Sequence, residues 1–362
     1  MLQLPAVLAA LVMAAAPLAV PAAPAGAGPV IDQNFADPDV MKVGRTYYAY
    51  ATNSDGRNIR WATSTDLVGW TVRESDALPT LGAWVDPDWT FPPGGSGDRG
   101  VWAPEVFATG PRSFVMWYTA HDRASGKQCI GAATATSPGG PFVPEDTALV
   151  CTPEIGGAID ASSYAESGRR YILWKNDGNC CAQDTWLRLQ QVSADGLRRV
   201  GAETPLIKQN KPFEGTLVEA PTLVKRGGAY VLFYSANFFG NGSYVSSYAT
   251  ASRLRGPYTK ASAPLMTTDA FAGPCAGRAG RTSWSAPTVA TGSSSTAGTP
   301  GSTTGRCTRG GSTGWTGGPS SRAPRSVMRP RTPTSPAPTP GTPPAAPATA
   351  WWSAVSTSPT AG

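Results

Sequence analysis

The chain repeats one unit of roughly 60 residues four times, and this repeat limits its fold more than any other feature. Each unit begins with an acidic residue or an Ala-Pro pair, continues through a short apolar run and a turn, and reaches an aromatic run. Such a period is typical of arrays and propellers, in which each unit is one supersecondary structure. The units begin at Asp37, Ala103, Asp160 and Ala220, and their aromatic runs are residues 47–50, 114–118, 171–174 and 230–234.

The second half of each unit predicts further strands. Residues 59–64, 130–137, 187–193 and 244–252 alternate small or apolar with polar side chains, as half-buried strands do. Four short strands per unit describe the blade of a propeller. We therefore predict an all-β fold, a five-bladed β-propeller, with blades 1–4 in residues 30–272. A β-sandwich also contains many short strands, but it does not explain so long an internal period.

The fifth blade is missing from the sequence as written, because residues 276–362 have the composition of a low-complexity tail. The segment contains no Leu, Ile, Phe, Tyr, Asp, Glu, Lys, His, Asn or Gln, so it cannot form a packed core. It holds eight arginines, and without them the rest of the chain is slightly acidic. The formal charge of +6 therefore belongs to the tail and gives no indication of nucleic-acid binding.

Two interpretations of this tail stay open, a genuine disordered linker and a translated frameshift. When the codons of Arg278 to Pro300 are read across their boundaries, the encoded residue classes become two apolar runs around a Gly-Asp-Gly turn. Two apolar runs around such a turn are typical of a β-hairpin. We therefore predict that a frameshift near Arg278 replaces the fifth blade and leaves residues 276–362 as a frameshifted tail.

The N-terminus predicts export. An apolar run extends from Leu4 to Val20, and the small residues that follow it suit signal peptidase. Pro17 and Pro21 argue against a membrane anchor, because they interrupt a run that is already short for a membrane span. We predict a signal peptide at residues 1–27 and a secreted, extracellular protein.

The six cysteines of an exported chain favour disulfides over metal sites. Cys129 and Cys151 flank one hairpin-like stretch and are expected to pair. Cys180 and Cys181 either bridge each other as sequence neighbours, or one of them reaches Cys275. No spacing of these residues resembles a zinc site, so we predict no metal ligands among them.

Three carboxylates stand at or beside the start of a repeat unit, namely those of Asp37, Asp160 and Glu219. In a propeller this point of each blade lies on the inner strand, which lines the central channel. The repeat therefore predicts that three acids far apart in the sequence meet at one site. Asp37 and Asp160 also fit simple turns, but Glu219 lies in an apolar stretch, where an unpaired acid costs free energy.

Such a set of acids suits the hydrolysis of a sugar acetal. One neutral carboxyl protonates the leaving oxygen, while an ionised one deprotonates a water on the opposite face of the sugar. Crowding of like charges raises the pKa of the acid that must stay protonated. If the reaction inverts configuration, the two carboxyls are expected ~6.5–9.5 Å apart, which leaves room for the water.

At these residues the sequence resembles glycoside hydrolase family 43, the arabinanase, arabinofuranosidase and xylosidase family. The resemblance runs from about Phe35 to Leu265, through ADPDVMKVGRTYYAY, VWAPEVF, AIDASSYAESGRRYILW and VEAPTLVKRGGAYVLFYSA. It implies that Asp37 is the general base and Glu219 the general acid. It also implies that Asp160 orients this acid and modulates its pKa. Trp102, in VWAPEVF, would contact the sugar at the cleavage site.

Members of that family usually carry a histidine in the last blade near the axis, often beside a calcium or other ion. The single histidine here, His121, follows the second aromatic run, and we expect it in a loop at the channel mouth. We take His121 and Phe91, which lies in the loop from Trp84 to Gly100, as substrate-binding residues. No cofactor is required, and the resemblance implies a structural calcium at the propeller axis.

The resemblance implies a hydrolase of plant polysaccharides, with arabinan, arabinoxylan or derived oligosaccharides as partners. We predict an inverting α-L-arabinofuranosidase, with β-xylosidase and endo-arabinanase as alternatives within the family. A non-catalytic carbohydrate-binding propeller is the alternative of another class, because a missing blade could leave recognition without turnover. We expect a monomer with no nucleic-acid or membrane partner.

Overall fold

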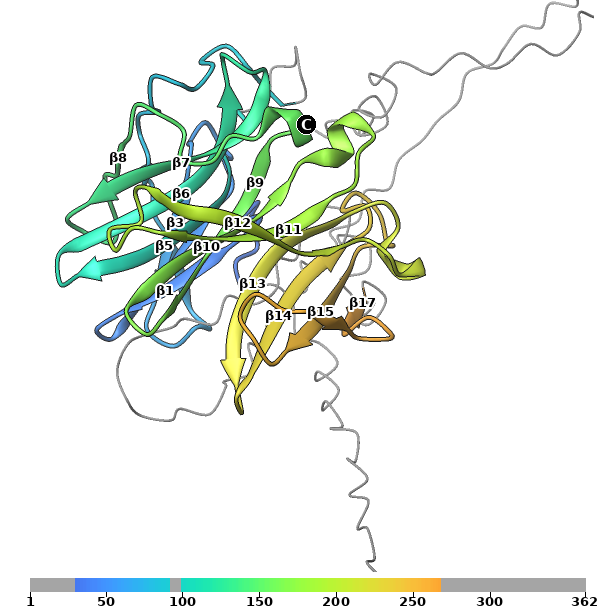
Figure 1. Ribbon diagram of the computed structural model, residues 1–362. Helices are drawn as coiled ribbons and strands as arrows, with labels where there is room; N and C mark the ends of the chain where they lie inside the picture. Colours follow the sequence, from blue (N-terminus) through green and yellow to red (C-terminus); the bar gives the residue numbers. More distant parts are fainter. Residues whose placement is uncertain (1–29, 92–98, 268–362) are drawn as a thin grey trace, which may run out of the picture.

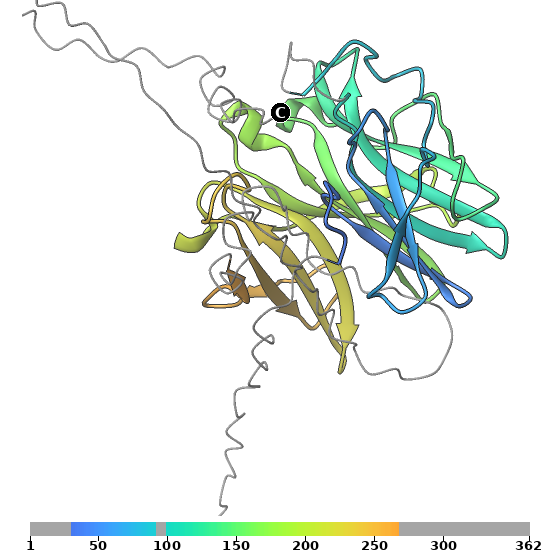
Figure 2. The ribbon, with the colours of Figure 1, turned by 180° about the vertical axis from the view of Figure 1, so that it is seen from behind.

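Each repeat unit folds into one antiparallel sheet, whose first four strands pair in chain order. The computed structural model describes residues 30–91 and 99–267 of the 362-residue chain. Its four sheets are arranged as blades around a common axis, which Figures 1 and 2 show from two opposite sides. The predicted all-β fold and the predicted blades 1–4 are thus confirmed.

The first strand of every blade lies at the axis, and the first strands of neighbouring blades pack against each other. These inner strands are β1 (Asp39–Val43), β5 (Trp102–Gly110), β9 (Ala158–Glu166) and β13 (Val218–Arg226). The second strands hold the aromatic runs and are β2 (Thr46–Ala51), β6 (Ser113–Asp122), β10 (Arg169–Asn176) and β14 (Ala229–Ala236).

The third strands are those that the alternating segments predicted. They are β3 (Arg60–Ser64), β7 (Lys127–Ala135), β11 (Trp186–Val192) and β15 (Val245–Ala251). The remaining strands are β4 (Trp70–Val72), β8 (Val143–Pro144), β12 (Arg199–Lys208), β16 (Thr259–Lys260) and β17 (Met266–Thr267). Three short 3-10 helices lie in the described loops, η1 (Pro153–Ile155), η2 (Gly178–Cys181) and η3 (Pro212–Glu214).

Two-residue turns join the first and second strands of blades 3 and 4. Ser167 and Gly168 turn the chain between β9 and β10 with φ angles of 52° and 73°. Gly227 and Gly228 do the same between β13 and β14 with 55° and 82°. Positive φ at both central residues matches the right-handed twist of the flanking strands, which explains the glycines there.

Alternate side chains of the second strands enter two different cores. In β6, Met116 and Tyr118 pack with blade 1, whereas Val115 and Trp117 pack with blade 3. Side chains along a strand point alternately to the two faces of its sheet. A blade between two neighbours therefore needs apolar residues at nearly every position of this strand, which explains the continuous aromatic runs.

Blade 4 buries one face more completely than the other among the described residues. Leu232 and Tyr234 of β14 are fully buried against blade 3. Val231 and Phe233, which alternate with them, are only half-buried. This is the face against which a fifth blade would pack. The predicted fifth blade and the tail of residues 276–362 lie outside the described residues, as does the predicted signal peptide.

The cysteines pair within the propeller. Cys129 of β7 bonds to Cys151, as expected from the sequence. Cys180 and Cys181 bond to each other in η2, which excludes the alternative bridge to Cys275. None of the helices in the described part of the chain is long and apolar enough to cross a membrane.

Candidate active site

The inner strands share one backbone irregularity where each repeat unit begins. Asp37, Ala103, Asp160 and Ala220 have positive φ angles of 49°, 43°, 56° and 49°. Residues other than glycine rarely adopt this conformation. In β5, β9 and β13 the strand register also shifts at this point, which marks a β-bulge. Bulges redirect side chains and are common beside active sites, so the repeat places one such position on every blade.

This alignment divides the three predicted acids into two positions. Asp37 and Asp160 occupy the positive-φ position of blades 1 and 3. Glu219 directly precedes that position in blade 4, as Trp102 does in blade 2. The fold therefore presents Glu219 from the strand position that holds an indole in blade 2.

Residues of all four inner strands line one small pocket at the axis. Its volume of about 40 Å³ exceeds the ~10–15 Å³ that a single water molecule needs. Both Asp37 and Asp160 belong to its lining. The lining residues are Asp37, Pro38, Asp39, Ala103, Pro104, Glu105, Asp160, Ala161, Ser162, Ala220, Pro221 and Thr222.

Thr52 fixes the carboxylate of Asp37. The Thr52 hydroxyl donates a hydrogen bond of 2.5 Å to Oδ2 of Asp37. The same hydroxyl oxygen accepts a bond of 3.0 Å from the backbone N–H of Ala103 in blade 2. Asp37 is thus held by a hydroxyl that is itself oriented by the neighbouring blade.

Asp160 interacts electrostatically with both of the other acids. Its Oδ2 accepts a hydrogen bond of 3.0 Å from the backbone N–H of Ala220. Burial raises the pKa of Asp160 to about 8, and the negative charges of Glu219 and Asp37 add to this rise, whereas Lys175 opposes it. Because the pKa of Asp160 responds to both other acids, the structure brings Asp37, Asp160 and Glu219 into one group, here called the acid cluster.

Glu219 has two side-chain partners that sequence reasoning missed. The ammonium of Lys175 donates a hydrogen bond of 3.1 Å to its Oε2. The hydroxyl of Tyr244 donates one of 2.9 Å to its Oε1. The Glu219 side chain is 12% exposed, so it is largely buried, and it is not among the residues that line the axial pocket. A lysine that ends the apolar run of β10 was the sequence signal for the first partner.

The three predicted substrate-binding residues gather around Trp89, which lies in the same loop as Phe91. Trp89 stacks on His121 with ring centroids 4.6 Å apart. Trp102 meets both Trp89 and Phe91 edge to face, at 5.8 and 5.2 Å. These four residues are called the aromatic wall below. Since Trp102 holds in blade 2 the position of Glu219 in blade 4, the wall begins at the inner strand.

One expectation for His121 is corrected. His121 lies inside β6 and pairs with Gln128 of β7, so it is a strand residue and no loop residue. Strand β6 continues beyond its aromatic residues, because Thr119 and Ala120 still pair with β7. This pairing includes His121 and places the histidine in the sheet. Burial lowers the pKa of His121, which keeps the imidazole neutral at neutral pH.

A second pair of carboxylates, Asp39 and Glu105, lies deeper on the inner strands. Asp39 is 4% and Glu105 6% exposed, and the two carboxyls hydrogen-bond each other. Burial raises the pKa of Asp39 well above its usual value and that of Glu105 to about 7. Each also accepts a backbone N–H of the next blade, from Val106 at 2.8 Å and from Ser163 at 2.7 Å. This axial pair therefore joins blades 1, 2 and 3.

The axial pocket offers oxygen ligands of the kind that calcium prefers. Asp37, Asp39, Glu105 and Asp160 all line it, so these residues fit the predicted calcium ion. Such an ion would supply positive charge beside Asp39, Glu105 and Asp160, whose pKa values burial raises. A separate group of possible ligands, Asp122 with the two cysteines 129 and 151, is unsuited to an ion because both sulfurs form a disulfide.

The acid cluster has the parts that hydrolysis of a sugar acetal needs. Asp37 supplies an oriented carboxylate, and Glu219 supplies a second carboxyl from another blade. Asp160 supplies a third carboxyl, which interacts electrostatically with both of them. The aromatic wall adds flat apolar surfaces, on which sugar rings pack through their C–H faces. The geometry is therefore suited to acid–base chemistry on a carbohydrate.

The chain is similar to known proteins over most of the described residues. The model of the family "Glycosyl hydrolases family 43" matches residues 27–311. An extracellular endo-α-(1→5)-L-arabinanase of Bacillus subtilis is 25% identical over 64% of this chain and 69% of its own length. A probable arabinan endo-1,5-α-L-arabinosidase of Aspergillus oryzae is 28% identical over 56% of this chain and 58% of its own length.

Solved structures show the same similarity. A thermostable family-43 glycoside hydrolase superposes with a TM-score of 0.56 at 28% identity, over 67% of this chain and 77% of that one. An endo-1,4-β-xylanase of Bacteroides thetaiotaomicron gives 0.50 at 29% identity, over 64% and 73%. The family match covers more than half of the chain and includes every residue of the acid cluster. The protein therefore belongs to glycosyl hydrolases family 43.

Proposed function

We propose that this family 43 protein is a secreted glycosidase that hydrolyses α-L-arabinofuranosyl bonds of arabinan with inversion at the anomeric carbon. The observation that carries the proposal is the acid cluster, in which three blades contribute carboxyls to one electrostatic environment. The names of the curated relatives support arabinan as the substrate.

In the proposed reaction Asp37 is the general base. Its carboxylate takes a proton from a water molecule, and the water oxygen forms the new bond to the anomeric carbon. Glu219 donates its proton to the glycosidic oxygen as the old bond breaks. Asp37 ends protonated and Glu219 ionised, and exchange of protons with solvent restores both.

Asp160 is proposed to modulate Glu219 electrostatically. A nearby negative charge disfavours ionisation of a carboxyl, and the charge of Glu219 adds to the rise in the pKa of Asp160. Tyr244, whose pKa burial and the charge of Glu219 raise well above its usual value, stays a neutral hydrogen-bond donor to Glu219. Lys175 and Tyr244 thus hold the Glu219 carboxyl in one orientation for the proposed proton transfer.

The mode of attack is proposed to be internal. The two curated relatives described above are named for endo cleavage of arabinan. Their names favour an endo-arabinanase over the α-L-arabinofuranosidase that the sequence motifs alone suggested. An endo-acting enzyme releases arabino-oligosaccharides first, whereas an arabinofuranosidase releases arabinose alone. A time course of products from linear arabinan distinguishes the two.

The aromatic wall is proposed to bind sugar rings next to the cleaved bond. Trp102→Ala removes a ring that contacts both Trp89 and Phe91. Stacking contacts that are equal in ground and transition states act on KM alone. We expect KM for arabinan to rise about tenfold, as loss of ~1.4 kcal/mol of binding would give, with a smaller change in kcat.

The proposal is tested by incubating the full chain with linear arabinan and following the products by proton NMR. Appearance of the β-anomer first supports inversion with Asp37 as base. Appearance of the α-anomer first contradicts that role. Binding of arabinan without any product would instead support a carbohydrate-binding propeller, the alternative that the retained acids do not favour.

Export and a monomeric state complete the proposal. The Bacillus subtilis relative is named extracellular, and the two disulfides are of the kind that persists in oxidising compartments. Detection of the chain in culture medium, trimmed near residue 27, would test the first. Its mass in solution, measured by light scattering, would test the second.

A further inference from the structure

Lys175 is a buried lysine that the proposed reaction does not use. It lies near the end of β10, and 1% of its side chain is exposed. An ammonium at this depth is costly unless other charges compensate it. Burial lowers the pKa of Lys175, but the charges of Glu219, Asp177 and Asp160 overcome this effect and raise the pKa above its usual value. Lys175 is therefore a permanent positive charge.

This ammonium is shared between two carboxylates. Its Nζ lies 3.1 Å from Oε2 of Glu219 and 3.5 Å from Oδ1 of Asp177. The first contact is a charge-assisted hydrogen bond, which is stronger than a neutral one. Lys175 extends from blade 3 while Glu219 belongs to blade 4, so the contact also joins the two blades.

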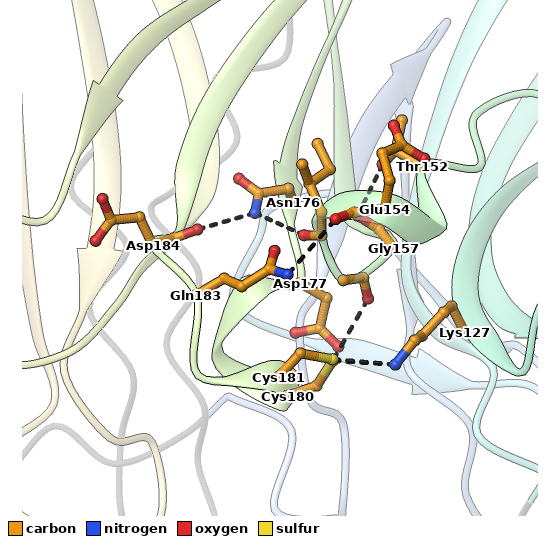
Figure 3. Close-up of a disulfide and its surroundings, with 12 residues drawn as sticks. Lys127, Thr152, Glu154, Gly157, Asn176, Asp177, Cys180, Cys181, Gln183 and Asp184 are labelled. Carbon is orange, nitrogen blue, oxygen red and sulfur yellow. Dashed lines mark hydrogen bonds between the residues drawn. A yellow bond between two sulfur atoms is a disulfide. The ribbon is translucent and has the colours of Figure 1, made fainter.

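Asp177 is held in place by a turn of blade 3. Its N–H donates to the carbonyl of Gly157 at 3.1 Å, and its carbonyl accepts the N–H of Cys180 at 3.2 Å. Figure 3 shows Asp177 beside the disulfide between Cys180 and Cys181. The disulfide closes the turn that follows Asp177. The second partner of Lys175 is thus fixed independently of blade 4.

The charges that face Glu219 come from several elements and do not balance. Carboxyls of β9 and of the loop after β10 interact with it electrostatically, and a phenol from before β15 donates a hydrogen bond to it. In the described part of the chain, the ammonium on β10 is the cation that bonds to Glu219. The groups that interact with Glu219 are Asp160, Asp177, Tyr244 and Lys175, and Asp37 interacts with Asp160 behind them.

We propose that Lys175 is a positioning residue for the general acid, which orients the Glu219 carboxyl and limits its tendency to hold a proton. Asp177 also interacts with the Lys175 ammonium, and its negative charge weakens the effect of Lys175 on Glu219. The inference rests on the proposed function, in which Glu219 is the acid. Lys175 and Asp160 then act in opposite directions, and the pH range of the enzyme is set by the difference between them.

The sign of each effect follows from electrostatics. The basic limb of kcat/KM reports the pKa of the acid in the free enzyme. Lys175→Met removes a positive charge beside Glu219, so this limb moves to higher pH. Asp177→Asn removes a negative charge and leaves Lys175 to Glu219 alone, so the limb moves to lower pH. Each shift is expected to be about 1 pH unit, the size of a close charge interaction.

The experiment compares pH profiles of the full chain and its variants on arabinan. Lys175→Arg keeps the charge and is expected to restore the limb toward the wild-type position. Lys260→Met is the matched control, because Lys260 is also buried and pairs with the buried Glu214, outside the acid cluster. This control loses stability and keeps the wild-type limb. Shifts in the same direction in Lys175→Met and Asp177→Asn, or no shift in either, would overturn the proposal.

A titration that needs no turnover separates the inference from the proposed function. Carbon-13 NMR of the glutamate carboxyls, with Glu219 assigned by its loss in Glu219→Gln, follows the Glu219 pKa directly. Opposite shifts in the two variants support the role of Lys175 even if the chain hydrolyses nothing. A pKa that stays fixed in both overturns it even if arabinan is cleaved. Should Lys175→Met fail to fold, the direction seen in Asp177→Asn decides.

Discussion

The acid cluster and the axial pair lie on the same inner strands and balance their charge in different ways. Asp37 belongs to the first and Asp39 to the second, only two residues further along blade 1. Hydroxyl and ammonium groups hold the cluster, through Thr52 on Asp37 and Lys175 on Glu219.

The axial pair is held by backbone N–H groups and by a hydrogen bond between its own two carboxyls. Arg170 lowers the pKa of Glu105 only slightly against the effect of burial. A bound proton therefore compensates the negative charge of the axial pair, whereas Lys175 compensates negative charge in the acid cluster. An acid that is held by side-chain partners at a pocket can exchange protons with a ligand. An acid that is completely buried instead helps to hold neighbouring blades together.

The largest expected effect distinguishes Asp37 from Asp39. Asp37→Ala removes the base that activates water, so we expect kcat on every substrate to fall by ~10²–10⁴-fold. The melting temperature should change little, because Asp37 lies at the pocket surface. Turnover of arabinan and of an aryl arabinoside, measured beside a thermal melt, checks both. Activity within tenfold of wild type would remove Asp37 from the cluster.

The second effect depends on the leaving group. Glu219→Ala removes the proton donor, so turnover of arabinan should fall by ~10²–10⁴-fold. Aryl glycosides with acidic phenol leaving groups need little protonation and should be largely spared. The ratio of kcat/KM on the two substrates is the measurement. Equal losses on both would refute the role of Glu219 as acid.

A smaller effect concerns the pH profile. Burial and the charge of Glu219 raise the pKa of Asp160 to about 8, so Asp160 becomes negative on the basic limb of the profile. Asp160→Asn removes this charge, which disfavours ionisation of a neighbouring acid. The basic limb of kcat/KM should move about 1 pH unit to lower pH, with a lower rate at its maximum. A profile measured at constant ionic strength checks the direction. A shift to higher pH would show that Asp160 does not raise the pKa of the acid.

The smallest effect belongs to the axial pair and appears in stability. The folded pKa of Glu105, about 7, lies above its usual value, so the folded state binds the proton more tightly. Its contribution to stability is present at low pH and is lost as pH rises toward about 7. We expect the melting temperature to fall over this range by at least ~2–4 °C, the shift given by ~1 kcal/mol.

Glu105→Gln tests this sign, because glutamine does not titrate. Its melting temperature should vary less with pH than that of the wild type between about pH 5 and about pH 8. A variant as pH-dependent as the wild type would show that Glu105 keeps no proton in the folded state. Asp160→Asn serves as the comparison within the acid cluster.

The sequence by itself determined the repeat, the blades and the three acids. Strand periodicity is local, so the apolar and aromatic runs, with the turn between them, predicted the strands of each blade. Asp37, Asp160 and Glu219 were found because a repeat fixes equivalent positions without any knowledge of distances. The pairing of Cys129 with Cys151 followed from their places around one hairpin.

Only the tertiary structure decided what each acid touches. Lys175 and Tyr244 reach Glu219 from 44 and 25 residues away, and no local pattern records which side chain crosses between two blades. The strand position of His121 and its stacking on Trp89 also depend on how blade 2 meets the preceding loop. Burial, and with it the pKa of Asp160 and Glu105, is a property of packed neighbours. A repeat can align residues, but only packing assigns their charges.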